Sequence, residues 1–564
     1  MNQTELKDSK SMQSLSGNSM QSKVQQELEQ YQHRIIIQKV PQFVVSEILE
    51  TSIVEIVKAV TNIIVFSLYM FHFGYKITAD LVFTYPFLEI VLVTVPKSGI
   101  QASATKLAMF LYHNQITAAK VYTTYLVTLY LIVVIGLQLS VGMFSQTLLQ
   151  NYVDQAVIDY FKLVLCCGVV SESMQAMLNL FLYAENRIFE QYVLQISQCV
   201  LHLIILLVSF LVLDTQNKTE DTQTAVKYAA VARVLSYAVA NAYFFYRLFA
   251  PISRGHISFN IINLQPLRWN LIWVMFRDFF IRFPGDIFMP ALKMAIIIFY
   301  KAENRSNNQS TQLSLIMFQM FILLFNLTNS ITNSAYLSLR HPIDVNKGLN
   351  LHNRIYDIMV YGFSISITFS VLSSLVLYCI APSIFNSLFV QYIDVNLQNQ
   401  FQNILQYAKY AVIPSIFQPG FYFTLMYAES HDQKHYSRML LVLQYLSGFS
   451  AVVLFFFNAG IYTQFLFSTL SSQALTGSIL FFRIIRTLRS SIKTVPENEV
   501  VQEEIGTLEL EHVEFKNEPK YEAKLDKTED TYVLDFSRSG IDSGFEIGSK
   551  PSHRKASESG SVLM

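Results

Sequence analysis

Long apolar runs, separated by short polar breaks, fill the chain between about residues 42 and 487. A helix needs about 20 mostly apolar residues to cross a lipid bilayer. By that measure we expect twelve membrane-spanning helices, at approximately 44–73, 78–104, 117–147, 156–184, 189–213, 224–249, 270–300, 311–338, 350–382, 400–428, 436–458 and 461–486. The pattern therefore predicts an all-α polytopic membrane protein.

Polar sequence flanks this hydrophobic body on both sides. Residues 1–41 are rich in Ser, Gln, Lys and Glu, and residues 488–564 combine an acidic run with Ser-rich sequence. Such segments have too few apolar side chains to bury a core. We expect a disordered N-terminal arm and a disordered C-terminal tail.

The hydrophobic body contains signs of an internal duplication. At one constant spacing, Glu47 and Glu55 of the first segment align with Asp278 and Asp286 of the seventh. At a slightly larger spacing, Tyr183-Ala184-Glu185 aligns with Tyr427-Ala428-Glu429, and Ser171 with Ser415. Transporters are often built from such repeats. We expect two pseudo-symmetric six-helix bundles, an N-lobe at 42–249 and a C-lobe at 269–487, joined by a basic linker at 250–268.

Basic residues in the short loops predict the orientation, because Lys and Arg concentrate on the cytoplasmic side. With the N-terminus inside, the cytoplasmic loops hold most of them: Lys106, Lys120, Arg187, Arg247, Arg254, Arg268, Arg340, Lys347, Lys434 and Arg438. Three glycosylation sequons, at Asn217, Asn304 and Asn308, then fall on the opposite side. We expect both termini in the cytosol and a location in the plasma membrane or a vacuolar or vesicular membrane.

Composition narrows the function. Charged residues make up only 15% of the chain, and 41 basic residues balance 41 acidic ones. Soluble domains carry about 25% charged residues, and nucleic-acid binders carry a basic excess. The sequence has no Walker-type loop, no His-Glu-x-x-His and no Gly-x-Ser-x-Gly motif. We therefore expect a bilayer protein that is not an enzyme, holds no cofactor or metal and binds no nucleic acid. We further expect it to be a monomer.

Charges inside the predicted membrane segments are the candidate site, because each costs about 3 kcal/mol to insert without a polar cavity or a partner. In the first segment, helical spacing places four of them on one side, and in the seventh four others cluster. These residues are Glu47, Glu50, Glu55 and Lys58, and Asp278, Arg282, Asp286 and Lys293.

Two interpretations of these charges remain open. They line a central aqueous cavity, where a carboxylate binds H⁺, Na⁺ or an organic cation, or they form structural ion pairs. Glu55 and Asp286 lie deeper in their segments, which favours the functional interpretation. Glu47 and Asp278 lie nearer the cytoplasmic end, where long side chains reach water more easily, which favours the structural one.

The fourth and tenth segments add two polar candidates, Glu172 and its nearest polar counterpart Gln418. Prolines predict local breaks in three segments. Pro284 and Pro290 flank Asp286 in the seventh, while the second and tenth contain Pro86 and Pro96, and Pro414 and Pro419.

The layout resembles the multidrug and toxic compound extrusion (MATE) transporters, as a divergent member of eukaryotic type. The resemblance rests on twelve segments in two similar halves and on the exits Phe181-Leu182-Tyr183-Ala184-Glu185-Asn186-Arg187 and Leu425-Met426-Tyr427-Ala428-Glu429. It implies a secondary active transporter that exports organic cations or xenobiotics by antiport with H⁺ or Na⁺ through alternating access.

The resemblance also assigns a site. Asp286 stands where the family often has an acidic residue in helix 7. In the tenth segment, where some members have a second acid, this chain has Ser415 and Gln418, and His113-Asn114-Gln115 replaces the Gly-containing stretch after helix 2.

Two other functions fit the same sequence. A flippase of lipid-linked saccharides in the same superfamily needs cations for pyrophosphate, and Arg277, Arg282, Lys293 and Arg233 are candidates. A non-transporting membrane scaffold or channel-like subunit would use the charges structurally and recruit partners through its tails.

Overall fold

The computed structural model describes residues 35, 38–112, 116–185, 187–215, 222–249, 268–303, 308–348, 351–393, 395–431, 433–456 and 472–494. The predicted arm, nearly all of the linker and nearly all of the tail therefore lie outside the described residues. So do positions 461–471 of the last predicted segment.

The first half of the body begins with α2 (Val40–Leu88), which changes direction at Gly74, where φ is +71°. A glycine adopts this left-handed backbone without the steric penalty of a Cβ. The chain continues through a π-helical turn, η1 (Glu89–Thr94), into α3 (Val95–Tyr112). The remaining elements of this half are α4 (Ile116–Leu149), α5 (Gln155–Cys166), η2 (Gly168–Val170), α6 (Glu172–Ala184), α7 (Ile188–Thr215) and α8 (Thr222–Phe249).

The second half begins with α9 (Trp269–Glu303), which is helical throughout although Pro284 and Pro290 lie inside it. The remaining described elements are α10 (Asn308–Thr328), α11 (Ser330–Gly348), α12 (His352–Phe389), η4 (Val390–Tyr392), α13 (Val395–Ala408), η5 (Lys409–Ile416), α14 (Gln418–His431), α15 (Gln433–Phe456) and α17 (Ser472–Thr494). If α2 is divided at Gly74 and interrupted helices are counted once, these described elements correspond to the twelve predicted segments.

The fourth segment differs from its prediction as one continuous helix. Its two parts, α5 and α6, meet at an angle of 54° around the 3-10 turn η2. At Gly168 a Cβ would lie 2.3 Å from Leu92 Cδ2 and 2.7 Å from the Gln138 side-chain oxygen, so side chains of η1 and α4 pack directly against this turn. The tenth segment is interrupted at the corresponding place by the 3-10 stretch η5, which contains Pro414.

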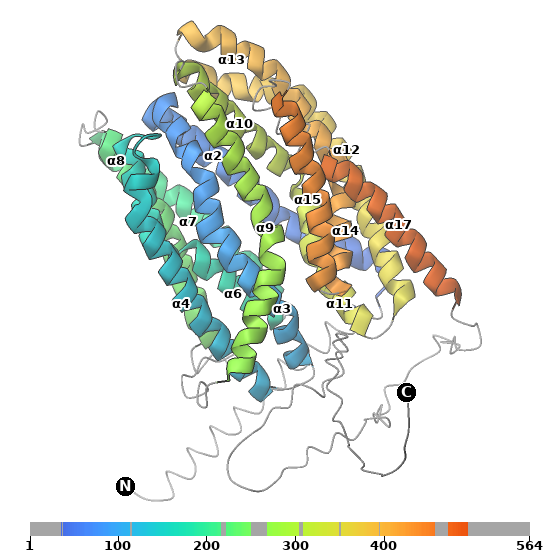
Figure 1. Cartoon of the computed structure of the whole chain (residues 1–564). Helices are drawn as coiled ribbons and strands as arrows, with labels where there is room; N and C mark the ends of the chain where they lie inside the picture. The colour runs from blue at the N-terminus through green and yellow to red at the C-terminus, as the bar shows by residue number, and fades with distance from the viewer. Residues whose placement is uncertain are drawn as a thin grey trace, which may run out of the picture. The chain divides into compact units, whose positions relative to one another are not determined.

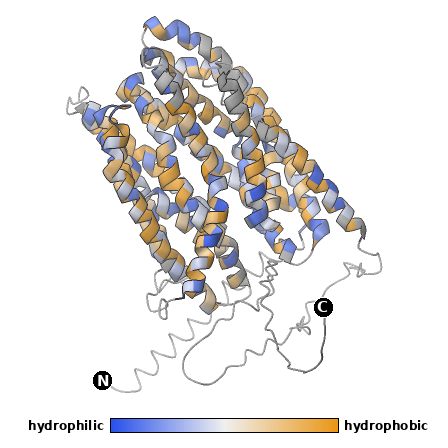
Figure 2. Cartoon of the chain, in the orientation of Figure 1, coloured by the Kyte–Doolittle hydropathy of each residue, from blue (hydrophilic) through white to orange (hydrophobic). Residues whose placement is uncertain are grey.

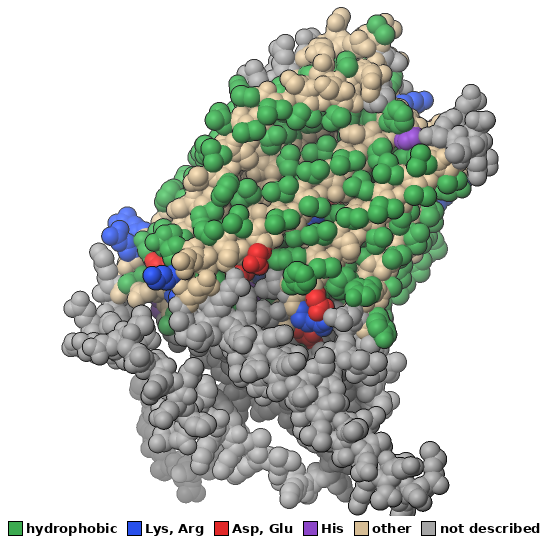
Figure 3. Space-filling view, turned by 180° about the vertical axis from the view of Figure 1, so that it is seen from behind, with side chains coloured by type: hydrophobic (Ala, Val, Ile, Leu, Met, Phe, Trp, Pro, Cys, Tyr) green, Lys and Arg blue, Asp and Glu red, His purple; other side chains and the backbone are tan. Residues whose placement is uncertain are grey.

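Five helical stretches of the described chain are long and apolar enough to cross a membrane, and the bent α5–α6 pair would make six. These stretches are Val40–Ala104, Ile116–Leu149, Phe189–Leu213, Thr311–Thr328 and His352–Phe389. Hydrophobic residues line most of the length of the helices in Figure 2. In Figure 3 they are spread over the described face, while charged side chains appear mainly near its lower edge, with a few at the left and at the upper right.

Each half packs mainly on itself. In the first half α7 contacts α8, α5 contacts α8, and α3 contacts α4 and α6, while in the second half α14 contacts α15 and α17, and α11 contacts α12. In Figure 1, α4, α7 and α8 lie on the left, α12, α15 and α17 on the right, and α9 between them. The halves meet along two seams, α3 with α9, and α2 with α10, α11 and α12.

Candidate functional site

Polar contacts run along the seam between the second and seventh segments. The two helices are antiparallel, because partners that come later on one helix come earlier on the other. From one end to the other these contacts are Asp80–Lys301 at 3.2 Å, Glu89–Lys293 at 3.2 Å, Ser98–Asp286 at 2.9 Å, Gln101–Arg282 at 2.5 Å, and Lys106–Asp278. We call this set the polar seam.

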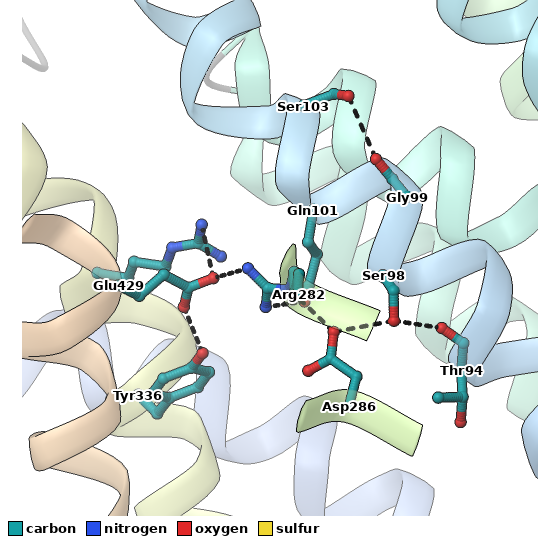
Figure 4. A network of polar contacts seen from close by, with 10 residues as sticks. Thr94, Ser98, Gly99, Gln101, Ser103, Arg282, Asp286, Tyr336 and Glu429 are labelled. Atoms are coloured by element: carbon teal, nitrogen blue, oxygen red, sulfur yellow. Dashed lines mark hydrogen bonds and ion pairs between the residues drawn. The ribbon is translucent and has the colours of Figure 1, made fainter. Parts of the chain in front are cut away.

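Arg282 lies at the centre of the candidate site, with its side chain only 1% exposed. Its Nε donates to Asp286 Oδ2 at 2.9 Å, its Nη1 to Glu429 Oε1 at 2.5 Å, and its Nη2 to the Gln101 side-chain oxygen. Figure 4 shows Arg282 between the two carboxylates, which come from α9 and α14. A buried charge is tolerated only when it is paired and hydrogen-bonded, and Arg282 meets both conditions.

Glu429, at the end of α14, is completely buried. Besides Arg282, its Oε1 is paired with Arg340 of α11 at 3.0 Å, and its Oε2 accepts a hydrogen bond from the Tyr336 hydroxyl at 2.5 Å. One carboxylate therefore holds three elements of the second half together.

Asp286 connects the network to the first half of the chain. Its Oδ2 accepts hydrogen bonds from Arg282 and from Ser98 of α3. Its side chain is 16% exposed, against 1% for Arg282, so solvent reaches this carboxylate more easily. An accessible carboxylate between the two halves is suited to exchange a proton or a cation.

Glu55 lies on the other seam. Its Oε1 is paired with Lys58 at 2.6 Å, and its Oε2 accepts a hydrogen bond from Asn333 of α11 at 2.7 Å. Lys58 also donates to Gln195 of α7. Glu55 and Asp286, which the alignment of the two halves pairs, thus each contact the opposite half of the molecule.

The other predicted acids of these two segments have different surroundings. Asp278 is buried and paired with Lys106 of α3 and with its neighbour Arg277. Glu47 is buried, whereas Glu50, three residues later, is exposed. The acids predicted on one side of the first segment therefore differ in their access to solvent.

Glu172 and Gln418 both begin helices that follow 3-10 turns, α6 and α14. Glu172 Oε1 is paired with Arg233 of α8 at 2.5 Å, and Arg233 also donates to the Tyr160 hydroxyl. Gln418 is buried, with 3% exposure. The two residues occupy corresponding places in the two halves but lie outside the hydrogen bonds of Arg282.

All four cations considered for pyrophosphate binding are occupied by carboxylates. Arg277 is paired with Asp278, Lys293 with Glu89, Arg233 with Glu172, and Arg282 with both Asp286 and Glu429.

Glu429 is the residue that sequence reasoning missed as a site member. The sequence marks Glu429 only as part of a repeat of Tyr183-Ala184-Glu185, because it lies beyond the predicted end of the tenth segment. The first copy of the motif also lies close to the network. Tyr183 makes an edge-to-face contact with His341 and lies under the Arg340 guanidinium, 5.8 Å from its ring centroid. The repeated Tyr-Ala-Glu motif therefore marks the C-terminal ends of two helices, and residues of both copies contact α11.

No family model and no curated protein matches this sequence. Solved structures do. A MATE protein in complex with MaL6 matches with a TM-score of 0.64 and 12% identity, over 81% of this chain and 99% of the other. An inward-facing multidrug resistance MATE family transporter of the MOP superfamily matches with a TM-score of 0.60 and 12% identity, over 79% and 99%. The chain has the MATE fold.

A further structure with the MATE fold has a different description. It is a MOP superfamily transporter from Pyrococcus furiosus, for which a reverse polarity of the binding pocket suggests a different function. It matches with a TM-score of 0.63 and 12% identity over 81% of this chain and 98% of the other. The MATE fold confirms the predicted all-α polytopic membrane architecture of two six-helix bundles.

Proposed function

We propose that this protein is a secondary active transporter, which exports organic cations or xenobiotics by antiport with H⁺ or Na⁺ through alternating access of its two six-helix lobes. The observation that carries the proposal is the buried Arg282, shared between the accessible carboxylate Asp286 and the sealed carboxylate Glu429. Ionisable groups at membrane depth are expensive, and their usual role is in ion and substrate pathways.

Coupling follows from the contacts of Asp286. A proton or Na⁺ on this carboxylate weakens its attraction for Arg282. Arg282 then keeps its hydrogen bonds to Glu429 and Gln101. At the same time the Ser98 hydroxyl, which donates to Asp286, faces a carboxyl group whose negative charge has been neutralised. Because Ser98 lies in the first half and Asp286 in the second, the binding event acts directly on the contact between lobes.

Glu55 supplies an equivalent element on the second seam. Its hydrogen bond with Asn333 joins α2 to α11, and its ion pair with Lys58 resembles the pair of Asp286 with Arg282. An organic cation that binds either carboxylate competes with the internal cation and with the coupling ion. Such competition makes the opposite movements of substrate and ion depend on each other.

The test uses full-length protein in proteoliposomes with an imposed pH or Na⁺ gradient and ethidium as the transported cation. We expect gradient-dependent ethidium movement in the wild type and its loss in Asp286→Asn combined with Glu55→Gln. Asp159→Asn is the matched control, because Asp159 is paired with Lys227 between α5 and α8, away from both seams. Unchanged gradient-driven transport in the correctly inserted double variant contradicts the proposal.

A further inference from the structure

Lys97, on α3, is a cation that forms no ion pair with a described carboxylate. It lies next to Ser98 and one helical turn before Gln101, the two α3 residues that bind Asp286 and Arg282. The residue is exposed to solvent, and within the described part of the chain no acidic side chain is close enough to form an ion pair with it.

The face of α3 that carries Lys97 points toward α9. Gln101 lies one helical turn after Lys97 on the same face, and it accepts a hydrogen bond from Arg282 of α9. Electrostatic interactions with Asp286 and Arg282 of α9, Glu429 of α14 and Lys58 of α2 agree with this position. Lys97 therefore lies on the side of the first half that faces the second.

The nearby carboxylates are already neutralised. Asp286 is bound to Arg282, Glu429 is bound to Arg282 and Arg340, and Glu55 of α2 is bound to Lys58. Lys97 has no such partner among the described residues, and an uncompensated ammonium at membrane depth is costly.

We infer that Lys97 binds an anionic group, a carboxylate or a phosphate, of the transported solute, so that the solute is a zwitterion or an amphiphile with an anionic head. The inference rests on the proposed transport function and specifies its substrate class. A compact ammonium on a flexible stem suits one such group as a point charge. In the proposed function the cationic part of the same solute competes with Arg282 for Asp286, so the site would offer the solute both charges.

The experiment compares two dyes that differ only at a carboxylate. Rhodamine B is a zwitterion with a free carboxylate, and its ethyl ester is a cation. Binding to purified full-length protein in dodecyl maltoside is measured by fluorescence polarisation without any gradient. We expect the wild type to bind rhodamine B at least about tenfold more tightly than the ester, a difference of about 1.4 kcal/mol.

The variants assign the preference to Lys97. Lys97→Met is expected to remove it by weakening rhodamine B binding while ester binding stays within about twofold. Lys97→Arg is expected to keep the preference, and Lys76→Met, which removes an exposed lysine of α2, to leave it unchanged. The inference is overturned if the wild type binds the dyes equally, if rhodamine B does not bind, or if Lys97→Met keeps the preference.

Two further measurements separate the sources of the anion and the two proposals. If short-chain phosphatidylglycerol displaces rhodamine B but phosphatidylcholine does not, the anion is a lipid headgroup. If neither lipid displaces it, the anion belongs to a soluble solute. Either result supports an anion site at Lys97. Dye preference without gradient-driven transport overturns the proposed function alone. Gradient-driven transport without dye preference overturns the role of Lys97 alone.

Discussion

Arg282 of α9 and Glu429 of α14 form an ion pair, 2.5 Å between Nη1 and Oε1, in which neither side chain is more than 1% exposed. The same guanidinium binds Asp286, which solvent reaches and which contacts the opposite lobe through Ser98. One arginine thus connects a sealed carboxylate to an accessible one. A change of charge at the accessible end alters how firmly Arg282 is held.

Arg282→Met should destabilise the protein strongly. Removing one partner of a buried ion pair leaves uncompensated charge and typically costs about 3 to 5 kcal/mol. Arg277→Met is the matched control, because the Arg277 side chain is 50% exposed and exposed pairs contribute about 1 kcal/mol or less. Unfolding in mixed detergent micelles measures both variants, and equal losses of stability would contradict the assignment of Arg282 as the centre of the network.

Gly477→Ala should loosen the contact between α14 and α17. A Cβ at Gly477 would lie 2.5 Å from the Phe421 Cα, and one at Gly420 would lie 2.4 Å from the Ser478 Cα, so backbone atoms would have to move. Overpacking of this kind costs about 1 to 3 kcal/mol. Small residues allow such close approach of membrane helices.

The control is Gly136→Ala on α4, where a Cβ meets nothing within 4 Å. Removing a glycine from a helix interior is expected to stabilise the protein by about 0.5 to 1 kcal/mol. The two substitutions should therefore shift the melting temperature in opposite directions, and a stabilised Gly477→Ala variant would show that α14 and α17 do not pack this closely.

The Asp344 carboxyl should make the stability of the protein depend on pH. It lies at the polar end of α11, beyond the predicted membrane span at 311–338. Burial raises the pKa of its carboxyl to about 6, opposed by the nearby Arg340 guanidinium. The raised pKa favours the protonated carboxyl in the folded state, so this group's stabilising contribution is present below about pH 4 and is lost as the pH rises through 6. Asp344→Asn should therefore raise the melting temperature at pH 7.5, and the gain should shrink as the pH falls from 6 to 4. A gain that is constant across this range would exclude titration of Asp344 as its cause.

The sequence predicted the segments well because hydrophobic length is a strong local signal. It also located Glu55 and Asp286 by their alignment in the two halves, and the structure places each at a seam between lobes. The composition of the fourth segment does not predict its break, where side chains of two other elements, Leu92 and Gln138, pack against Gly168. Ser171 and Ser415, which the sequence aligns only as a sign of duplication, both lie at the 3-10 interruptions of their segments.

The sequence predicts ion pairs within one helix better than ion pairs between helices. Charges at steps of four on the seventh segment predicted pairs along one face, and Arg282 with Asp286 is such a pair. Asp278 and Lys293 instead bind Lys106 and Glu89 of the second segment. No local pattern reveals which helix will lie alongside another, so the polar seam could be recognised only in three dimensions.

The Glu429→Gln variant tests coupling to the ion gradient separately from movement of the substrate. The neutral amide keeps the shape of the side chain but removes the charge that holds Arg282 when Asp286 binds H⁺ or Na⁺. It also removes the carboxylate paired with Arg340, so a loss of stability of about 3 to 5 kcal/mol is expected, and counterflow shows that the variant is still folded. In proteoliposomes, we expect this variant to exchange ethidium down its own gradient, as counterflow, while losing accumulation driven by a pH or Na⁺ gradient. Accumulation at the wild-type level in Glu429→Gln would contradict the role of the Arg282 network in coupling.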